Sequence, residues 1–324
     1  MEQVYKYMVA TTCMTYNHVS YIEDALNGFA NQNTTFPIVF CVVDDASTDG
    51  EQEFLRKWAD DNLEIKNNEY SHVVFSNGER YCATLKNRHQ ITFVIVLLFE
   101  NHYGKKSKFP YISEWLSQSK YQALCEGDDY WIEPSKIQRQ VDYLERNPTI
   151  VLTCHRYKTY NQELGVWEEE KNEKLFKGVD EGFAFNRHNN RGWLTKTLSL
   201  VFRSEFIKGH EDSLDFVIIY YLMKNGDGYV FNDFWGVYRK HNGGVCSKNS
   251  RFENVKRMYY VVKKLYEEDP NNVTRKIYYD EYATMIIITK GKILLHEKFE
   301  IKKVLHLPVS YIKKIYNYII HFFS

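Results

Sequence analysis

Three carboxylates stand close together in one short segment, Glu126, Asp128 and Asp129. They follow the apolar run 121–125, which is typical of a buried strand, and open α/β sheets bind ligands beyond the carboxyl ends of their strands. Like charges this close repel one another, so they commonly share a cation or a hydrogen-bond network. Hard oxygen donors suit Mg²⁺ or Mn²⁺, which often hold a substrate phosphate through one or two carboxylates. The pattern predicts a metal site; a solvated acidic turn that caps the next helix is the alternative.

Polar residues also end the first two predicted strands, at positions 14–18 and 44–50. Neighbouring strand ends share one crevice in a doubly wound sheet. There Tyr16 can stack on a base, and Asp44 or Asp45 can accept hydrogen bonds from a base or ribose. Each signal is weak alone, because Tyr16 could be a rim aromatic and Asp44 a turn carboxylate. Combined with the acidic segment, they predict a pocket for a nucleoside diphosphate.

Short apolar runs alternate with helix-like segments, which is typical of an α/β sheet built from βαβ units. We predict strands at residues 8–13, 38–43, 72–75, 93–99, 121–125, 150–155 and 198–203, and helices at 21–29 and 134–147. The polar stretch 161–190 has weak periodicity and is predicted to be a long loop. The chain should therefore form a doubly wound, mostly parallel sheet flanked by helices at residues 1–247. A helical, lysine-rich C-terminal extension is expected at 248–324.

Charge and composition narrow the class of protein. The 324 residues carry 42 basic and 42 acidic side chains, so no net charge attracts nucleic acid. The 26 Tyr and 20 Phe fit a folded chain rather than a disordered one. None of the six cysteines forms a CxxC pair, which favours buried thiols over a zinc site or disulfides. Without a signal-peptide pattern or an apolar run long enough to span a bilayer, the chain is predicted to be cytoplasmic.

The polar segments together resemble the family 2 glycosyltransferases of the GT-A fold. The resemblance rests on Thr15-Tyr16-Asn17 and on residues 43–50 and 123–131, in that order and spacing. Residues 197–203 and 236–244 look like two further blocks of the family, so the resemblance covers roughly residues 6–247. It implies metal-dependent, inverting transfer of a sugar from a nucleoside-diphosphate sugar to a hydroxyl group. Uridine donors and surface-glycan or lipid-linked acceptors are common in the family, so a UDP-sugar donor and polysaccharide synthesis are favoured.

The resemblance assigns the donor pocket to the first two strand ends. Tyr16 and Asp45 would contact the base of the nucleotide sugar. Thr15, Asn17 and Asp44 belong to the same two motifs and are expected in the same pocket.

The family's Asp-x-Asp metal motif corresponds to Glu126 and Asp128, followed by Asp129. Glu stands where Asp is commoner, so its carboxylate reaches one methylene further, toward the ribose or the metal. Asp128 is the favoured ligand for Mn²⁺ or Mg²⁺, with Asp129 next. By residue type alone, His241 could also bind the metal and Arg239 could pair with the diphosphate. A plain loop histidine is an equally good interpretation of His241.

The acceptor hydroxyl must lose its proton as it attacks, which calls for a carboxylate base. Family members carry this acid ahead of an apolar helix, and Asp215 directly precedes the apolar run 216–223. Asp212 and Glu211 are competing matches, because a Glu-Asp pair is also common here. All three could instead be acids that favour a helix N-terminus.

Two other functions are compatible with parts of the pattern. A nucleotidyltransferase acting on sugar phosphates would usually need a Gly-rich phosphate loop after the first strand, and the first glycine is Gly28. A non-catalytic carbohydrate-binding protein would not need Asp45, Asp128 and a downstream base together. Release of nucleoside diphosphate from nucleotide sugars would separate these functions.

The C-terminal residues 309–323 place apolar side chains at helical spacing beside several lysines. Such a helix can lie in a membrane interface, which would bring the protein to the inner face of a membrane as a peripheral protein. Packing against its own domain or in a homo-oligomer is the alternative.

Overall fold

The computed structural model describes residues 4–66, 70–169, 172–186, 196–244, 250–290, 293, 300–305, 307–308, 311–313 and 315–316. The chain divides into two compact units, Met1–Lys240 and His241–Ser324. The predicted domain boundary at residue 247 lies outside the described residues and stays a prediction.

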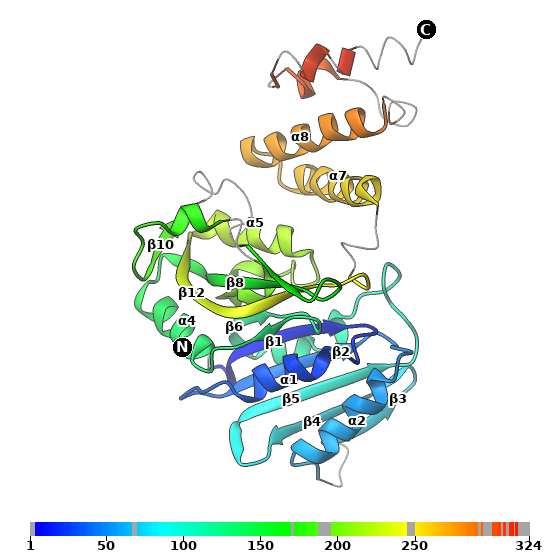
Figure 1. Cartoon of the computed structure of the whole chain (residues 1–324), viewed down its shortest axis with the longest axis vertical. Helices are drawn as coiled ribbons and strands as arrows, with labels where there is room; N and C mark the ends of the chain where they lie inside the picture. Colours follow the sequence, from blue (N-terminus) through cyan, green and yellow to red (C-terminus); the bar gives the residue numbers. More distant parts are fainter. Residues whose placement is uncertain are drawn as a thin grey trace. The chain divides into compact units, whose positions relative to one another are not determined.

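Unit 1 is built on one large mixed sheet (Figure 1). The strand order is β10-β12-β8-β11-β6-β1-β2-β5-β4-β3, with β7 paired to β12 and β9 paired to β8. The central pairs β1–β2, β1–β6 and β2–β5 are parallel, and β11 lies antiparallel between β6 and β8. The described strands are β1 Tyr7–Thr15, β2 Ile38–Asp44, β3 His72–Phe75, β4 Gly78–Leu85, β5 Arg88–Leu98, β6 Ser119–Leu124, β7 Tyr130–Trp131, β8 Ile150–Asn161, β9 Val166–Glu168, β10 Gly182–Phe185, β11 Val201–Arg203 and β12 Asp227–Lys240.

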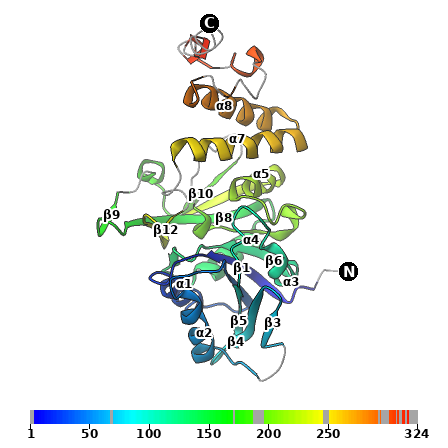
Figure 2. The same ribbon diagram turned by 90° about the vertical axis from the view of Figure 1, so that its right-hand side faces the viewer.

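Helices cover both faces of this sheet, which is why its central strands are largely buried. All seven residues of β2 are buried. The helices α1 (Ile22–Ala30), α2 (Glu51–Asn62) and α4 (Lys136–Arg146) pack into the core on one face. The short α3 (Ser113–Ser117) packs on the other face, opposite α1 and α2 (Figure 2). The helix α5 (Asp215–Asn225) packs against β8, β11 and β12.

The prediction of a long loop at residues 161–190 is wrong in part. This segment contains β9, which pairs with the end of β8, and β10, which pairs with β12. Val166 and Trp167 in β9 are exposed, so this strand lacks the apolar alternation from which a strand is recognised. Backbone pairing with residues distant in sequence holds β10 in the sheet.

Unit 2 contains a helical hairpin, as the predicted helical extension requires. The helix α7 (Arg251–Glu268) begins at a capping box of Ser250 and Glu253, and α8 (Asn272–Ile288) begins at one of Asn271 and Thr274. The two helices pack through buried tyrosines, Tyr259, Tyr278 and Tyr282. Most of the predicted helix at 309–323 lies outside the described residues. Among the described residues, no helix has the length and apolar character needed to cross a membrane.

Candidate active site

The parallel pairing of β1 with β2 and β6 brings three polar loops to one edge of the sheet. Thr15 pairs with Asp44 in register, and Thr12 pairs with Leu124. The loop after β6 then folds back over β1, because the Gly127 N–H donates to the Met14 carbonyl at 3.0 Å. A Cβ on Gly127 would lie 2.4 Å from Thr15 Oγ1, so only glycine allows this approach. The acidic segment and the first motif therefore share one site.

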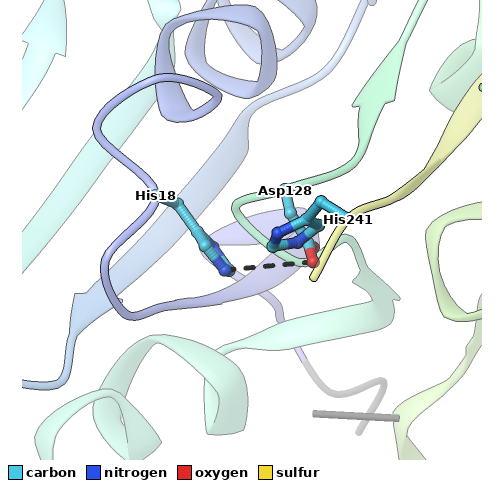
Figure 3. Close-up of side chains that lie close together, drawn as sticks. All are labelled: His18, Asp128 and His241. Carbon is cyan, nitrogen blue, oxygen red and sulfur yellow. Dashed lines mark ion pairs between the residues drawn. The ribbon is translucent and has the colours of Figure 1, made fainter. Parts of the chain in front are cut away.

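Three side chains that could hold a metal ion converge here (Figure 3). His18 lies in the loop after β1, Asp128 in the turn after β6, and His241 directly after the last residue of β12. Their ligand atoms all lie within 4.8 Å of one another. His18 Nε2 lies 3.9 Å from Asp128 Oδ2. The sequence predicted Asp128 and His241 for this role and missed His18, although His18 ends the same motif as Tyr16.

The orientation of His18 is set by a buried carboxylate. The Thr15 hydroxyl donates to Glu51 Oε1 at 2.5 Å, and Thr15 Oγ1 lies 3.2 Å from His18 Nδ1. Since the hydroxyl proton points to Glu51, the Thr15 oxygen accepts from Nδ1–H. In this tautomer the ring nitrogen that carries the lone pair is Nε2, which lies on the side of Asp128. Glu51 is not predictable from its residue type, because a glutamate in the first turn of a helix is an ordinary dipole-favouring residue.

Glu51 also ties the first two loops together. Its Oε2 accepts from the His18 N–H at 2.8 Å and from the Ser47 hydroxyl at 2.9 Å. Burial raises the pKa of Glu51 to about 7, although these donors act in the opposite direction. Asn17, with a positive φ of 58°, donates its N–H to Ser47 Oγ and accepts from the Thr48 N–H. Between these contacts Tyr16 remains 39% exposed, enough for a flat ligand to stack on it.

Asp44 and Asp45 are both buried but have different surroundings. Asp44 accepts from the Ser47 N–H and from Gln52, and burial raises its pKa. Asp45 accepts from the His102 N–H at 2.7 Å and from Lys108 Nζ at 3.1 Å. Asp45 thus holds the segment after β5 against the site. The sequence did not single out Lys108, since its position depends on the path of that segment.

Asp129 and Arg239 belong to a second network beside the three-residue group. Asp129 is 2% exposed, and its Oδ1 accepts from the Arg239 N–H at 2.8 Å. The Arg239 guanidinium donates to Asp24 at 2.6 Å and to the Asp128 carbonyl at 3.1 Å. It also lies over the ring of Tyr21. In this arrangement Asp129 does not join the three-residue group, and Arg239 joins the acidic turn to helix α1.

Glu126 lies within electrostatic range of Asp215, one of the three predicted bases. Burial, together with the negative charges of Asp128 and Asp215, raises its pKa to about 8. Asp215 is the first residue of α5, where its Oδ1 accepts the Phe216 N–H at 2.8 Å. Asp212 is exposed and Glu211 half-buried in the turn before this helix. Of the three candidate bases, Asp215 is among the main causes of the raised pKa of Glu126.

Known proteins are similar to this chain in part of its sequence and in its fold. Residues 13–83 match the family model Glycosyl transferase family 2. Uncharacterized proteins of Mycobacterium tuberculosis and Mycobacterium bovis are each 31% identical over 142 residues, which is 44% of this chain. The match spans 33% of the length of these curated relatives.

Two solved structures are similar over nearly the whole chain. Staphylococcus aureus TarS (residues 1–349, in complex with UDP-GlcNAc) is 16% identical with a TM-score of 0.56, over 96% of this chain and 79% of that one. The mannosyltransferase PcManGT from Pyrobaculum calidifontis, in complex with GDP-Man and Mn²⁺, is 14% identical with a TM-score of 0.52. The similarity covers 98% of this chain and 86% of that one. The predicted resemblance is therefore confirmed, with a glycosyl transferase family 2 segment at residues 13–83 within a GT-A fold.

Proposed function

We propose that this protein transfers a sugar from a nucleoside-diphosphate sugar to a hydroxyl group of an acceptor, with the help of a divalent cation. The observation that carries this proposal is the group of His18, Asp128 and His241, which meets at the edge of the sheet where β1, β2 and β6 end. Ligands of open α/β sheets bind at this edge. The solved structures with this fold hold UDP-GlcNAc or GDP-Man, which supports a nucleotide-sugar donor.

The side chains of this group fit a transition-metal dication better than Mg²⁺. Mg²⁺ prefers oxygen ligands, whereas this group offers two imidazoles beside one carboxylate. We propose Mn²⁺, the ion held by the mannosyltransferase structure of the same fold. It would be held by His18 Nε2, one Asp128 oxygen and His241, while Asp129 supports the Arg239 backbone. When bound, the cation would act as a Lewis acid that stabilises negative charge on the departing diphosphate.

The donor would lie across the loops after β1 and β2. Tyr16 offers an exposed aromatic face for the base, and Asp45 offers the remaining lone pairs of its carboxylate. Lys108 contributes a positive charge that pairs with Asp45 and partly offsets the rise in the pKa of Glu126. A uridine base is favoured by the family resemblance. Arg239 fixes the acidic turn through its hydrogen bonds to Asp24 and the Asp128 carbonyl.

Asp215 is the proposed general base. Its carboxylate would take the proton of the acceptor hydroxyl as that oxygen attacks the sugar, so that one displacement inverts the anomeric carbon. Asp212 and Glu211 are the competing residues. A glycan or lipid-linked acceptor in surface polysaccharide synthesis, at the inner face of a membrane, completes the proposal by analogy with the family.

The proposal is tested by release of nucleoside diphosphate from UDP-glucose, UDP-GlcNAc, UDP-galactose and GDP-mannose, with and without acceptor sugars. Release should require Mn²⁺ and stop with EDTA. The variant Asp128→Asn should lose at least about 100-fold of the rate because the only carboxylate of the three-residue group is gone. Asp60→Asn changes an exposed acid on α2 and should retain the rate. Full release in EDTA, or release of pyrophosphate from a nucleoside triphosphate and a sugar phosphate, would contradict the proposal.

A further inference from the structure

A surface pocket of about 320 Å³ lies outside the group of His18, Asp128 and His241. It is formed by the β8–β9 hairpin and by β12. Its lining residues combine aromatic rings with charged and hydroxyl side chains: Tyr157, Lys158, Thr159, Trp167, Glu168 and Phe234. This volume is at the lower end of small-molecule sites, which span about 300–1,000 Å³.

Aromatic side chains give the pocket flat apolar surfaces. Trp167 is 56% exposed although it is the largest side chain of the hairpin. It is supported from one side by Tyr160, its partner in the strand pair, at a centroid distance of 4.9 Å. Phe234 is held by the Arg156 guanidinium, 4.2 Å from its ring. The rings are therefore supported by neighbouring side chains, while a large part of Trp167 faces solvent.

Polar groups stand beside these rings. Lys158 is exposed, Thr159 carries a hydroxyl, and Glu168 is fixed by an ion pair with Lys240. A pyranose ring presents C–H groups on its faces and hydroxyl groups around its edge. It matches a pocket with an aromatic surface and surrounding hydrogen-bond donors and acceptors better than a purely apolar ligand does.

The hairpin is bonded to the end of β12 that leads into the candidate active site. Glu168 pairs with Lys240, and the Gln162 N–H donates to the Lys240 carbonyl at 2.9 Å. The next residue is His241, one of the three proposed metal-binding side chains. Phe234, another lining residue of the pocket, stands six residues before Lys240 on the same strand. One strand therefore leads from the pocket to the proposed site of transfer.

We propose that this pocket binds a saccharide ring of the acceptor, away from the ring that carries the reacting hydroxyl. The inference rests on the proposed function and assigns the acceptor to carbohydrates. Trp167 supplies the stacking surface, and Lys158 and Glu168 bind hydroxyl groups of the ring.

Saturation-transfer NMR on the whole chain tests the pocket without donor, metal or turnover. The probes are the methyl glycosides of glucose, galactose, mannose and N-acetylglucosamine, and their β-linked disaccharides. At least one probe should bind, and Trp167→Ala should weaken its binding about tenfold, the loss expected for one aromatic stacking contact. Trp167→Phe keeps an aromatic face and should retain most of the binding.

Leu164→Ala is the matched control, because Leu164 is 71% exposed in the same hairpin and does not line the pocket. It should bind the probe as the wild type does. Equal binding by Trp167→Ala and wild type, or no binding of any probe, would overturn the pocket assignment. Because this readout needs no nucleotide sugar, it distinguishes a wrong pocket from a failure of the proposed transferase activity.

Discussion

Replacing Thr15 by valine should weaken metal binding although Thr15 is not one of the three proposed ligands. Valine keeps the shape of the side chain but removes both the bond to Glu51 and the contact with His18 Nδ1. The imidazole of His18 then loses the group that fixes its tautomer and ring orientation. Removing such a supporting partner of a metal ligand typically costs about 10–100-fold in affinity. This corresponds to about 1.4–2.8 kcal/mol.

The same substitution should destabilise the fold in a pH-dependent way. Glu51 would keep two of its three donors, the His18 N–H and the Ser47 hydroxyl. The lost donor favours the ionised carboxylate, so its removal raises the pKa of Glu51 above about 7. Thr15→Val should therefore lower the free energy of unfolding by about 1–3 kcal/mol at pH 8, the cost for a buried group that loses a partner, and by less at pH 5.

Two measurements follow these effects separately. Titration of Mn²⁺, with the free ion detected by electron paramagnetic resonance, gives the metal affinity, and urea denaturation at pH 5 and pH 8 gives the free energy of unfolding. Thr15→Ser keeps the hydroxyl and should bind Mn²⁺ within about threefold of wild type, a difference below 1 kcal/mol. Equal Mn²⁺ affinity of Thr15→Val, Thr15→Ser and wild type would refute the role of Thr15 in orienting His18.

Three other substitutions test the remaining parts of the account. Lys136 is fully buried over the Trp131 ring, and burial lowers its pKa to about 7. The unfolded chain keeps the Lys136 proton up to the ordinary lysine pKa, so the free energy of unfolding of the wild type should rise with pH above about 7. Lys136→Met should remove this pH dependence and stabilise the fold by about 1–4 kcal/mol at pH 7, as measured by urea denaturation. Asp215→Asn should reduce sugar transfer about 100-fold or more with unchanged nucleotide affinity by calorimetry, and the same result for Asp212→Asn alone would move the base to Asp212. Lys108→Ala removes the ion pair to Asp45 and should weaken binding of the nucleoside diphosphate about tenfold in calorimetry. Lys105→Ala, which changes an exposed lysine nearby, should leave that affinity unchanged. Equal affinities of Lys108→Ala and wild type would exclude Lys108 from the donor pocket.

The central strands and the acidic segment could be predicted because their signals are local. A continuous apolar run such as residues 38–43 is most stable as a strand that is covered on both faces. Parallel pairing then brings the segments after β1, β2 and β6 together, so Asp45 and Asp128 were predicted at one edge of the sheet.

Residues that depend on the path of a loop could not be predicted in this way. His18 reaches Asp128 only because Glu51 holds the loop after β1, and Lys108 reaches Asp45 only because the segment after β5 folds back. The strand β9 is likewise defined by its pairing with β8, since its own sequence is short and exposed. In each case the deciding contacts join residues that are distant in sequence, and residue type alone gives no signal for them.

The most direct test of the central claim is anomalous diffraction at the manganese edge from a crystal grown with Mn²⁺ and UDP. We predict one strong anomalous peak within about 2.5 Å of His18 Nε2, an Asp128 oxygen and His241, with the diphosphate of UDP beside it. The group was selected because its ligand atoms already lie within 4.8 Å of one another. A peak held by Asp129 and Glu126 without the two histidines, or UDP bound with no metal beside these side chains, would contradict the account.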